Sequence, residues 1–123
     1  MSKKTVPNKP VKRPWGHYTV IFRGKSFDND CVVKHIVVNP GEEISLQYHT
    51  KRKEIWTMLT MGYLRLGDDN KLYKVHPGNV IHIKPLDVHQ IKADLLCSTE
   101  FIEVQYGICS EEDIVRIEDK YGR

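Results

Sequence analysis

The chain has 123 residues, of which 40% are hydrophobic and 28% are charged, with a formal net charge of +3. These values are typical of one globular domain, and no apolar run approaches the ~20 residues that a membrane-spanning helix needs. Of 19 Lys and Arg residues, five precede residue 14, which leaves 14 cations against 16 Asp and Glu and argues against a nucleic-acid-binding face. Three cysteines without C-x-x-C spacing argue against a disulfide framework and a structural zinc site.

The first twelve residues are predicted to form a basic N-terminal arm, because their lysines alternate with Pro7 and Pro10 and no acid precedes Asp28. Residues 13–123 are predicted to form a single domain. The N-terminus is charged but is not followed by an apolar segment, so it does not resemble a secretory signal. A cytoplasmic protein with neither a membrane nor a nucleic-acid partner is therefore expected.

Further along the chain, apolar residues recur with a period of two, which indicates β-strands. Strands are predicted at 18–22, 31–38, 43–49, 54–61, 72–75, 79–83 and 100–106. Turn sequences such as Asn39-Pro40-Gly41 separate them. Only the end of the chain has helical character: Ser110 and Asp113 resemble a capping box, so a helix of two to three turns is predicted over 111–122. Its Ile114, Val115 and Ile117 are expected to face the strands. The predicted fold is all-β with a short C-terminal helix.

The stretch SLQYHTKRKEIW, Ser45 to Trp56, combines groups that suit a metal site. Alternation along a strand places Gln47 and His49 on one face, and a hairpin is expected to return Glu54 towards His49. His89, after the strand at 79–83, is the natural fourth member. Nitrogen and oxygen ligands without a thiolate suit Zn²⁺, Mn²⁺, Fe²⁺, Co²⁺ or Ni²⁺, in a site with an open position for a substrate.

The spacing of these residues resembles the double motif of the cupins. Five residues separate Gly41 from Gln47-x-His49, and four residues separate His49 from Glu54. Gly62 and Gly78 follow, and His89 comes after them. Gln47 stands in the place of the first histidine. The resemblance implies a double-stranded β-helix, a jelly-roll barrel.

A closer resemblance, from Arg13 to Arg123, is to the cupin domain of type II mannose-6-phosphate isomerases. It is carried by RPWGHY, VVKHIVVNPGEEISLQYHTKRKEIW, FIEVQYG and EEDIVRIEDKYGR. It implies one divalent ion, with zinc as the first choice, held by Gln47, His49, Glu54 and His89. It also implies a sugar-phosphate substrate and a homodimer, and it assigns Arg52 to the arginine important for activity. The residues that also match family positions are Trp15, Gly16, Lys34, Glu103, Gln105 and Arg116. The guanylyltransferase half that often precedes this domain has no counterpart here, and no Gly-rich nucleotide loop is present.

The implied reaction interconverts mannose 6-phosphate and fructose 6-phosphate through an enediolate and needs a general base. Glu103 is the first candidate, because it shares a strand face with Gln105; Lys34 and His82 are alternatives. Glu103 could equally be a hydrogen-bond partner that orients a ligand histidine. Arg52, Lys51, Lys34 and Arg116 are candidates for binding phosphate. Two other hypotheses stay open: a metal-containing cupin that binds a sugar or sugar nucleotide without turnover, and an isomerase or epimerase of another sugar.

Overall fold

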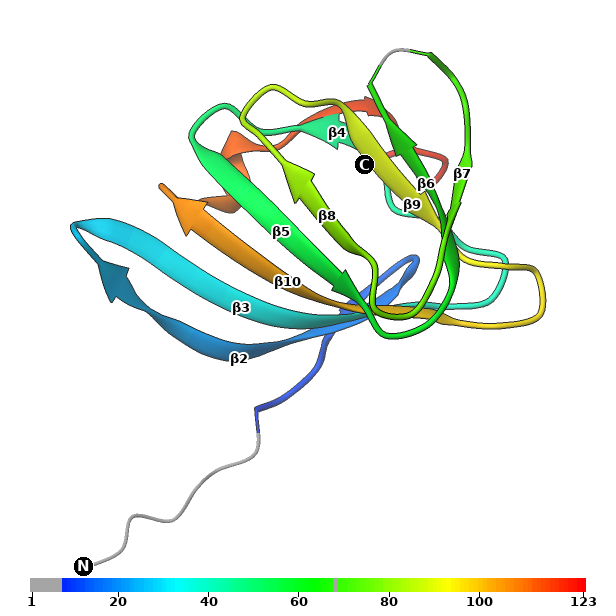
Figure 1. Cartoon of the computed structure of the whole chain (residues 1–123), viewed down its shortest axis with the longest axis horizontal. Helices are drawn as coiled ribbons and strands as arrows, with labels where there is room; N and C mark the ends of the chain where they lie inside the picture. The colour runs from blue at the N-terminus through cyan, green and yellow to red at the C-terminus, as the bar shows by residue number, and fades with distance from the viewer. Residues whose placement is uncertain (1–7, 68) are drawn as a thin grey trace, which may run out of the picture.

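The computed structural model describes residues 8–67 and 69–123, which form two antiparallel sheets (Figure 1). The six-stranded sheet has the order β1 (Val11–Arg13), β2 (Gly16–Ser26), β3 (Asn29–Val38), β10 (Thr99–Gly107), β5 (Arg52–Met58) and β8 (Val80–Ile83). The five-stranded sheet has the order β11 (Val115–Glu118), β4 (Leu46–Tyr48), β9 (His89–Lys92), β6 (Gly62–Leu66) and β7 (Tyr73–Val75). The predicted all-β fold is confirmed.

The predicted strands correspond to β2, β3, β4, β5, β7, β8 and β10, with shifted ends. Four strands were not predicted: β1, β6, β9 and β11. Residues 1–7 of the predicted arm lie outside the described residues, while Val11 and Lys12 belong to β1 and pair with β2.

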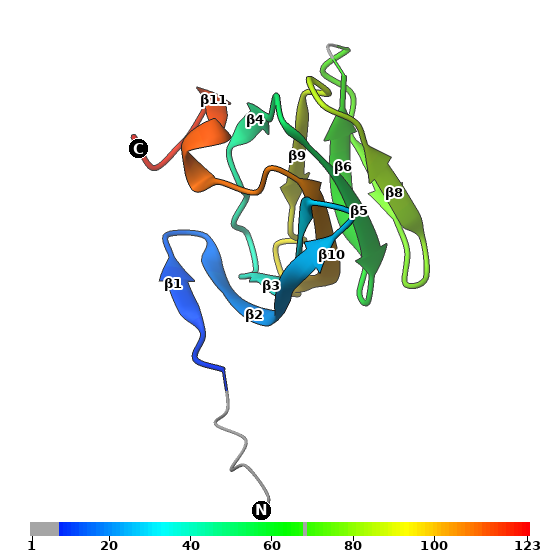
Figure 2. The same ribbon diagram turned by 90° about the vertical axis from the view of Figure 1, so that its left-hand side faces the viewer.

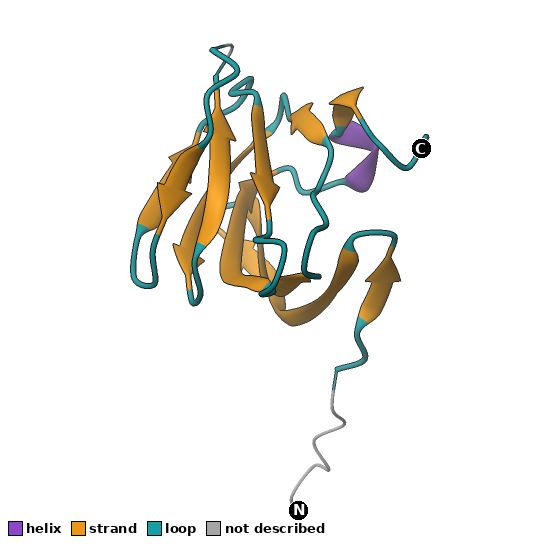
Figure 3. Ribbon diagram, turned by 90° about the vertical axis from the view of Figure 1, so that its right-hand side faces the viewer, coloured by secondary structure: helices purple, strands orange, loops and turns teal. Residues whose placement is uncertain are grey.

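The predicted C-terminal helix is wrong in extent. One 3-10 turn, Glu111–Asp113, is followed by strand β11, which pairs with β4 (Figure 3). Ser110 does cap the turn, because its Oγ accepts from the Glu112 amide at 3.2 Å. The Asp113 carboxylate, however, accepts from the Thr50 and Lys51 amides at 3.1 and 2.8 Å instead of closing a capping box. Val115 and Ile117 remain 41% and 50% exposed rather than facing the core. No helix within the described ranges has the length and apolar character to span a membrane.

The interior between the sheets has an apolar end and a polar end. On β5 the even-numbered residues point inward, and on β10 the odd-numbered ones do. Trp56, Met58 and Phe101 are 0–1% exposed and form part of the apolar core. The strand register places Gln105 opposite Glu54, and Glu103 opposite Trp56 and Lys34. Alternation and register together therefore gather buried polar side chains at one end of the barrel.

The turn between β1 and β2 depends on a glycine. Gly16 has φ +154°, and a Cβ built on it would lie 2.0 Å from the carbonyl oxygen of Val37. The Asn39 amide donates to the Trp15 carbonyl at 2.9 Å, which fixes the same turn against β3. This close approach positions Arg13 and Trp15 beside the polar end of the barrel, where both line a pocket.

We therefore expect Gly16→Ala to destabilise the fold by about 3 kcal/mol, because the backbone must move to relieve the clash. Gly78→Ala is the matched control: Gly78 also has a positive φ of +88°, but nothing lies within 4 Å of the position that a Cβ would take there. The control should cost only about 1 kcal/mol. Denaturant unfolding of both variants tests the difference, and equal losses would show that the contact with Val37 does not restrict this turn.

Candidate metal centre and adjoining pocket

Three of the four predicted ligands meet in the interior. His49 follows β4 in one sheet, Glu54 lies on β5 in the other, and His89 begins β9. The sequence predicted that β4 and β5 form a hairpin, and this prediction is wrong, because the two strands belong to different sheets. The turn between them crosses from one sheet to the other. The crossing nevertheless brings His49 to Glu54, and the pairing of β4 with β9 sets Gln47 opposite His89.

The cluster is compact and buried. His49 Nε2 lies 3.0 Å from Glu54 Oε2, and His89 Nε2 lies 3.9 Å from Glu54 Oε1. The three side chains are at most 2% exposed. One ligand atom from each lies within 4.8 Å of the others. Ligands bonded to one zinc ion at ~2.0–2.1 Å lie roughly 3.0–3.4 Å apart, so small adjustments would allow shared coordination.

The hydrogen bonding of the histidines also fits a metal. His89 Nδ1 lies 2.8 Å from the Asp87 carbonyl, so Nδ1 carries the proton and Nε2 is left with its lone pair. His89 Nε2 is buried without a hydrogen-bond partner among the described residues. Burial lowers the pKa of His89, which favours the neutral form that binds metals, although the Glu54 charge opposes this shift. An unpaired buried nitrogen is costly, and a bound cation would satisfy it.

Gln47, the fourth predicted ligand, lines the adjoining pocket. Its Oε1 accepts a hydrogen bond from Ser45 Oγ at 2.8 Å. An amide oxygen has two lone pairs, so this contact leaves one available. Ser45 is 2% exposed and was not singled out from the sequence; its contact orients the Gln47 amide.

Arg52 is buried against the cluster and does not extend freely into a phosphate site. Its Nε lies 3.0 Å from Glu54 Oε2, and its Nη1 donates to the Ser110 carbonyl at 3.2 Å. Its Nη2 lies 3.5 Å from His49 Nε2. Gly107 faces Arg52 across the strand pair, and a Cβ there would lie 2.5 Å from the Lys51 carbonyl oxygen. Arg52 thus fixes the position of the Glu54 carboxylate while its other edge lines the pocket.

Glu103 is held beside the cluster by two donors. Trp56 Nε1 donates to Glu54 Oε1 at 3.0 Å and to Glu103 Oε1 at 3.2 Å, and Gln105 Nε2 donates to Glu103 Oε2 at 3.0 Å. Burial and the neighbouring Glu54 charge raise the pKa of Glu103 well above its usual range, against the opposing charges of Lys34 and Arg52. Burial also raises the pKa of Glu54, but hydrogen bonds from His49 and Glu103 outweigh it and hold that pKa well below its ordinary value. Burial and neighbouring groups therefore shift the pKa values of these two adjacent carboxyl groups in opposite directions.

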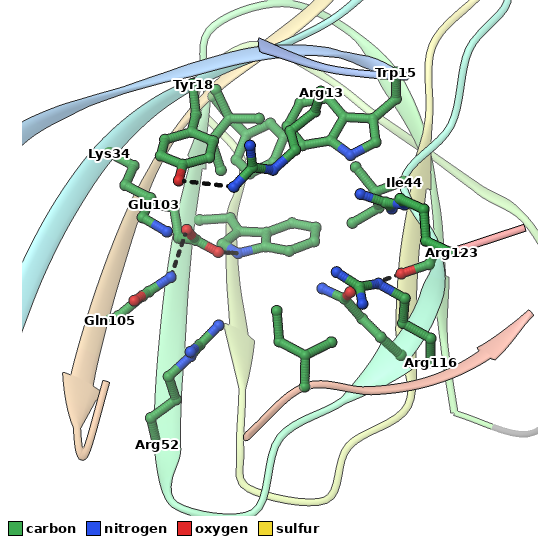
Figure 4. Close-up of a pocket in the computed structure, with 16 residues that line it drawn as sticks. Arg13, Trp15, Tyr18, Lys34, Ile44, Arg52, Glu103, Gln105, Arg116 and Arg123 are labelled. Carbon is green, nitrogen blue, oxygen red and sulfur yellow. Dashed lines mark hydrogen bonds between the residues drawn. The ribbon is translucent and has the colours of Figure 1, made fainter. Parts of the chain in front are cut away.

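A pocket that includes about 570 Å³ of open space lies beside the cluster (Figure 4). The predicted site residues that line it are Lys34, Gln47, Arg52, Glu103, Gln105 and Arg116. His82 and Lys51, two alternatives from the sequence, are exposed and do not line it. Arg13, Tyr18 and Arg123 line the pocket without having been predicted. Two cations lie near the Tyr18 ring, with Lys34 Nζ 4.4 Å and Arg13 Cζ 5.2 Å from its centroid.

Two facing antiparallel sheets around a His/Glu/His cluster define the chain as a cupin, a double-stranded β-helix. Solved structures with the same fold include the capsular polysaccharide assembling protein CapF from Staphylococcus aureus, with a TM-score of 0.76 and 14% identity over 94% of this chain and 35% of that one. The cupin-2 domain protein Rru_A2000 from Rhodospirillum rubrum has a TM-score of 0.62 and 18% identity over 91% of this chain and 82% of that one.

Residues 2–119 match the family described as "Mannose-6-phosphate isomerase C-terminal", and the chain belongs to this family. The alginate biosynthesis protein AlgA of Pseudomonas aeruginosa is 38% identical over 92% of this chain and 23% of its own length. The xanthan biosynthesis protein XanB of Xanthomonas campestris pv. campestris is 40% identical over 94% of this chain and 24% of its own. The mannose-1-phosphate guanylyltransferase RfbM of Salmonella typhimurium is 34% identical over 91% and 22%. The chain spans about a quarter of the length of these relatives.

Proposed function

We propose that the chain is a metal-dependent sugar-phosphate isomerase that interconverts mannose 6-phosphate and fructose 6-phosphate. The observation that carries the proposal is the buried His49–Glu54–His89 cluster next to a pocket that contains a carboxyl group and several cations. Membership of the mannose-6-phosphate isomerase C-terminal family supports the choice of reaction.

Each proposed role follows from a contact. His49, Glu54 and His89, with Gln47 beside them, would hold a divalent ion, and zinc fits this donor set. When bound, such an ion supplies Lewis acidity towards the carbonyl and hydroxyl oxygens of the open-chain sugar. Glu103 would take the proton from C2 and return it at C1, because its carboxyl lines the pocket beside the cluster. Gln105 and Trp56 would keep that carboxyl in position through their hydrogen bonds.

Lys34 and Arg52 would stabilise the negative charge that develops on the substrate oxygens. Lys34 is opposite Glu103 in the strand register and lines the same pocket. A buried, fixed cation stabilises developing charge more strongly than a solvated one, because little reorganisation is needed.

A binding protein without turnover is the second candidate, and one observation favours it. All three nitrogens of Arg52 lie within 3.5 Å of protein acceptors, so this side chain already has a structural task. An Arg52 used only in this way would hold Glu54 in place without contributing to a reaction.

Replacing Arg52 by lysine separates the two candidates. Lysine keeps the charge but cannot reach Glu54 and Ser110 together, because it lacks the planar fork. For an isomerase, we expect kcat/KM to fall by roughly 10²–10³ with the fold retained. For a binding protein, affinity would weaken with no turnover to lose. Lys53→Ala is the neighbouring control, since Lys53 is exposed on the other face of β5, and it should behave almost as the unmodified protein does.

The proposal itself is tested by a coupled assay of metal-analysed protein with mannose 6-phosphate, which should yield fructose 6-phosphate. Neutral mannose should react poorly, because it lacks the anionic group. A protein with a full metal complement that converts neither sugar would overturn the isomerase assignment in favour of the binding protein.

A further inference from the structure

The pocket has far more positive than negative charge. The cations that line it are Arg13, Lys34, Arg52, Arg116 and Arg123. Glu103 is the one carboxylic acid among its described lining residues. Like charges gathered in a recess repel one another, so such a set is stabilised when an anion lies between them.

These cations divide into two groups. Lys34 and Arg52 are 6% and 4% exposed. Lys34 lies on β3, which pairs with the strand β10 that carries Glu103, and Arg52 lies on β5 together with Glu54. Arg13 comes from β1, and Arg116 and Arg123 come from the C-terminal segment, which lies on the same side of the barrel as β1 (Figure 2). In Figure 4, Arg116 and Arg123 lie together on the side of the pocket opposite Lys34, Glu103 and Gln105. Arg13 reaches in beside Trp15, between these two sides.

The C-terminal segment is anchored so that its arginines stay at the pocket. At its start, the Asp113 carboxylate accepts from the Lys51 amide at 2.8 Å. Near its end, Lys120 Nζ lies 3.0 Å from Glu42 Oε1, and Tyr121 Oη donates to Glu42 Oε2 at 3.2 Å. β11 between these anchors pairs with β4, with Arg116 opposite Gln47. The segment is therefore attached to the barrel at both ends.

The guanidinium groups keep donors available. Arg123 uses Nε for Asp119 at 2.9 Å, which leaves its two Nη groups. Arg13 Nη2 donates to Tyr18 Oη at 3.3 Å and Nη1 to the Lys12 carbonyl at 3.0 Å, so its fork is oriented but not paired with a carboxylate. The Arg116 side chain has no hydrogen bond or ion pair within residues 8–67 and 69–123. Planar forks with free N–H groups are suited to the tetrahedral oxygens of a phosphoryl group.

We propose that Arg13, Arg116 and Arg123 form the phosphate-binding end of the pocket, so that a sugar phosphate lies with its phosphate at these arginines and its reacting carbons at Glu103. The inference rests on the proposed function and gives the substrate an orientation. It also moves phosphate recognition away from Arg52, which pairs with Glu54. A phosphate monoester and the diphosphate of a nucleotide sugar share this chemistry, and the monoester is the proposed ligand because it is the group that the substrate of the proposed function carries.

The test uses the double variant Arg116→Ala/Arg123→Ala in the full chain, with binding of mannose 6-phosphate and of inorganic phosphate measured by calorimetry. Charged hydrogen bonds of this kind contribute roughly tenfold to hundredfold in affinity each. We expect at least a hundredfold loss for mannose 6-phosphate, a loss of phosphate binding, and unchanged metal content. Both arginines lie near the end of the chain on exposed positions, so the fold should be retained, which circular dichroism would verify.

Arg23→Ala is the matched control, because Arg23 is an exposed arginine on β2 that does not line this pocket. Unchanged affinity in the double variant, or an equal loss in the control, would overturn the proposed phosphate site. A nucleoside diphosphate sugar is titrated in the same way, and a loss confined to it, with mannose 6-phosphate unaffected, would overturn the monoester assignment.

The binding measurement does not depend on turnover, so its failure can be told apart from failure of the proposed function. Selective loss of phosphate binding in a protein without isomerase activity would support the phosphate site and contradict the isomerase. Isomerase activity with an unchanged KM in the double variant would contradict the phosphate site and leave the isomerase intact.

Discussion

His89→Ala is expected to lose most of the divalent metal that the unmodified protein carries at about one ion per chain. The variant removes the buried Nε2 that has no partner within the described residues and whose orientation is fixed through Nδ1 and the Asp87 carbonyl. No thiolate is available to substitute, because none of the cysteines belongs to the cluster. Elemental analysis of the purified protein measures the effect.

His82→Ala provides the control for this experiment. His82 lies on the neighbouring strand β8 but is exposed, so its removal should leave the metal content unchanged. A full complement of metal in His89→Ala would remove this histidine from the ligand set.

Glu103→Gln is expected to lower turnover by roughly 10²–10⁴ while the metal is retained, the range for losing a group that transfers a proton. Glutamine keeps the size of the side chain and can still accept from Trp56 Nε1. It cannot accept and return a proton, so kcat should fall more than KM changes. Steady-state kinetics and elemental analysis on the same preparation separate a catalytic effect from loss of metal.

The matched variant is Glu100→Gln on the same strand. Glu100 points to the opposite face and pairs with His35 at 3.0 Å, away from the pocket. The Glu100→Gln variant should therefore retain the activity of the unmodified protein. If Glu103→Gln kept full turnover, Glu103 would be a hydrogen-bond partner within the site and not the base.

The sequence predicted the strands whose alternation is regular and missed β9, whose composition reflects the site. β9 contains His89 and Gln90, which are polar yet 0% and 3% exposed, so alternation of apolar and polar residues is lost there. The C-terminal helix was predicted from a local capping pattern, but the Asp113 carboxylate binds the distant Thr50 and Lys51 amides. This tertiary contact outweighed the local helical preference, because a helix as short as the predicted one is only marginally stable without tertiary packing.

The ligand cluster was accessible from sequence because His49 and Glu54 are close along the chain and the spacing to His89 resembles a known motif. Arg13 and Arg123, which also line the pocket, were not accessible in this way, because they are separated by nearly the whole sequence. They meet only because the Gly16 turn brings Arg13 back over the barrel and the contacts of Lys120 and Tyr121 with Glu42 bring the C-terminus to it. Nothing in the local sequence around either arginine indicates this meeting.

The buried cluster and the adjoining pocket are together proposed to isomerise a sugar phosphate. The most direct measurement is nuclear magnetic resonance of mannose 6-phosphate in deuterium oxide, with protein before chelation, after chelation and after restoring one divalent ion per chain. We expect fructose 6-phosphate and deuterium at C2 of the aldose, both abolished by chelation and recovered with the metal. Metal-loaded, folded protein that leaves mannose 6-phosphate unconverted and free of deuterium would contradict the proposed isomerase.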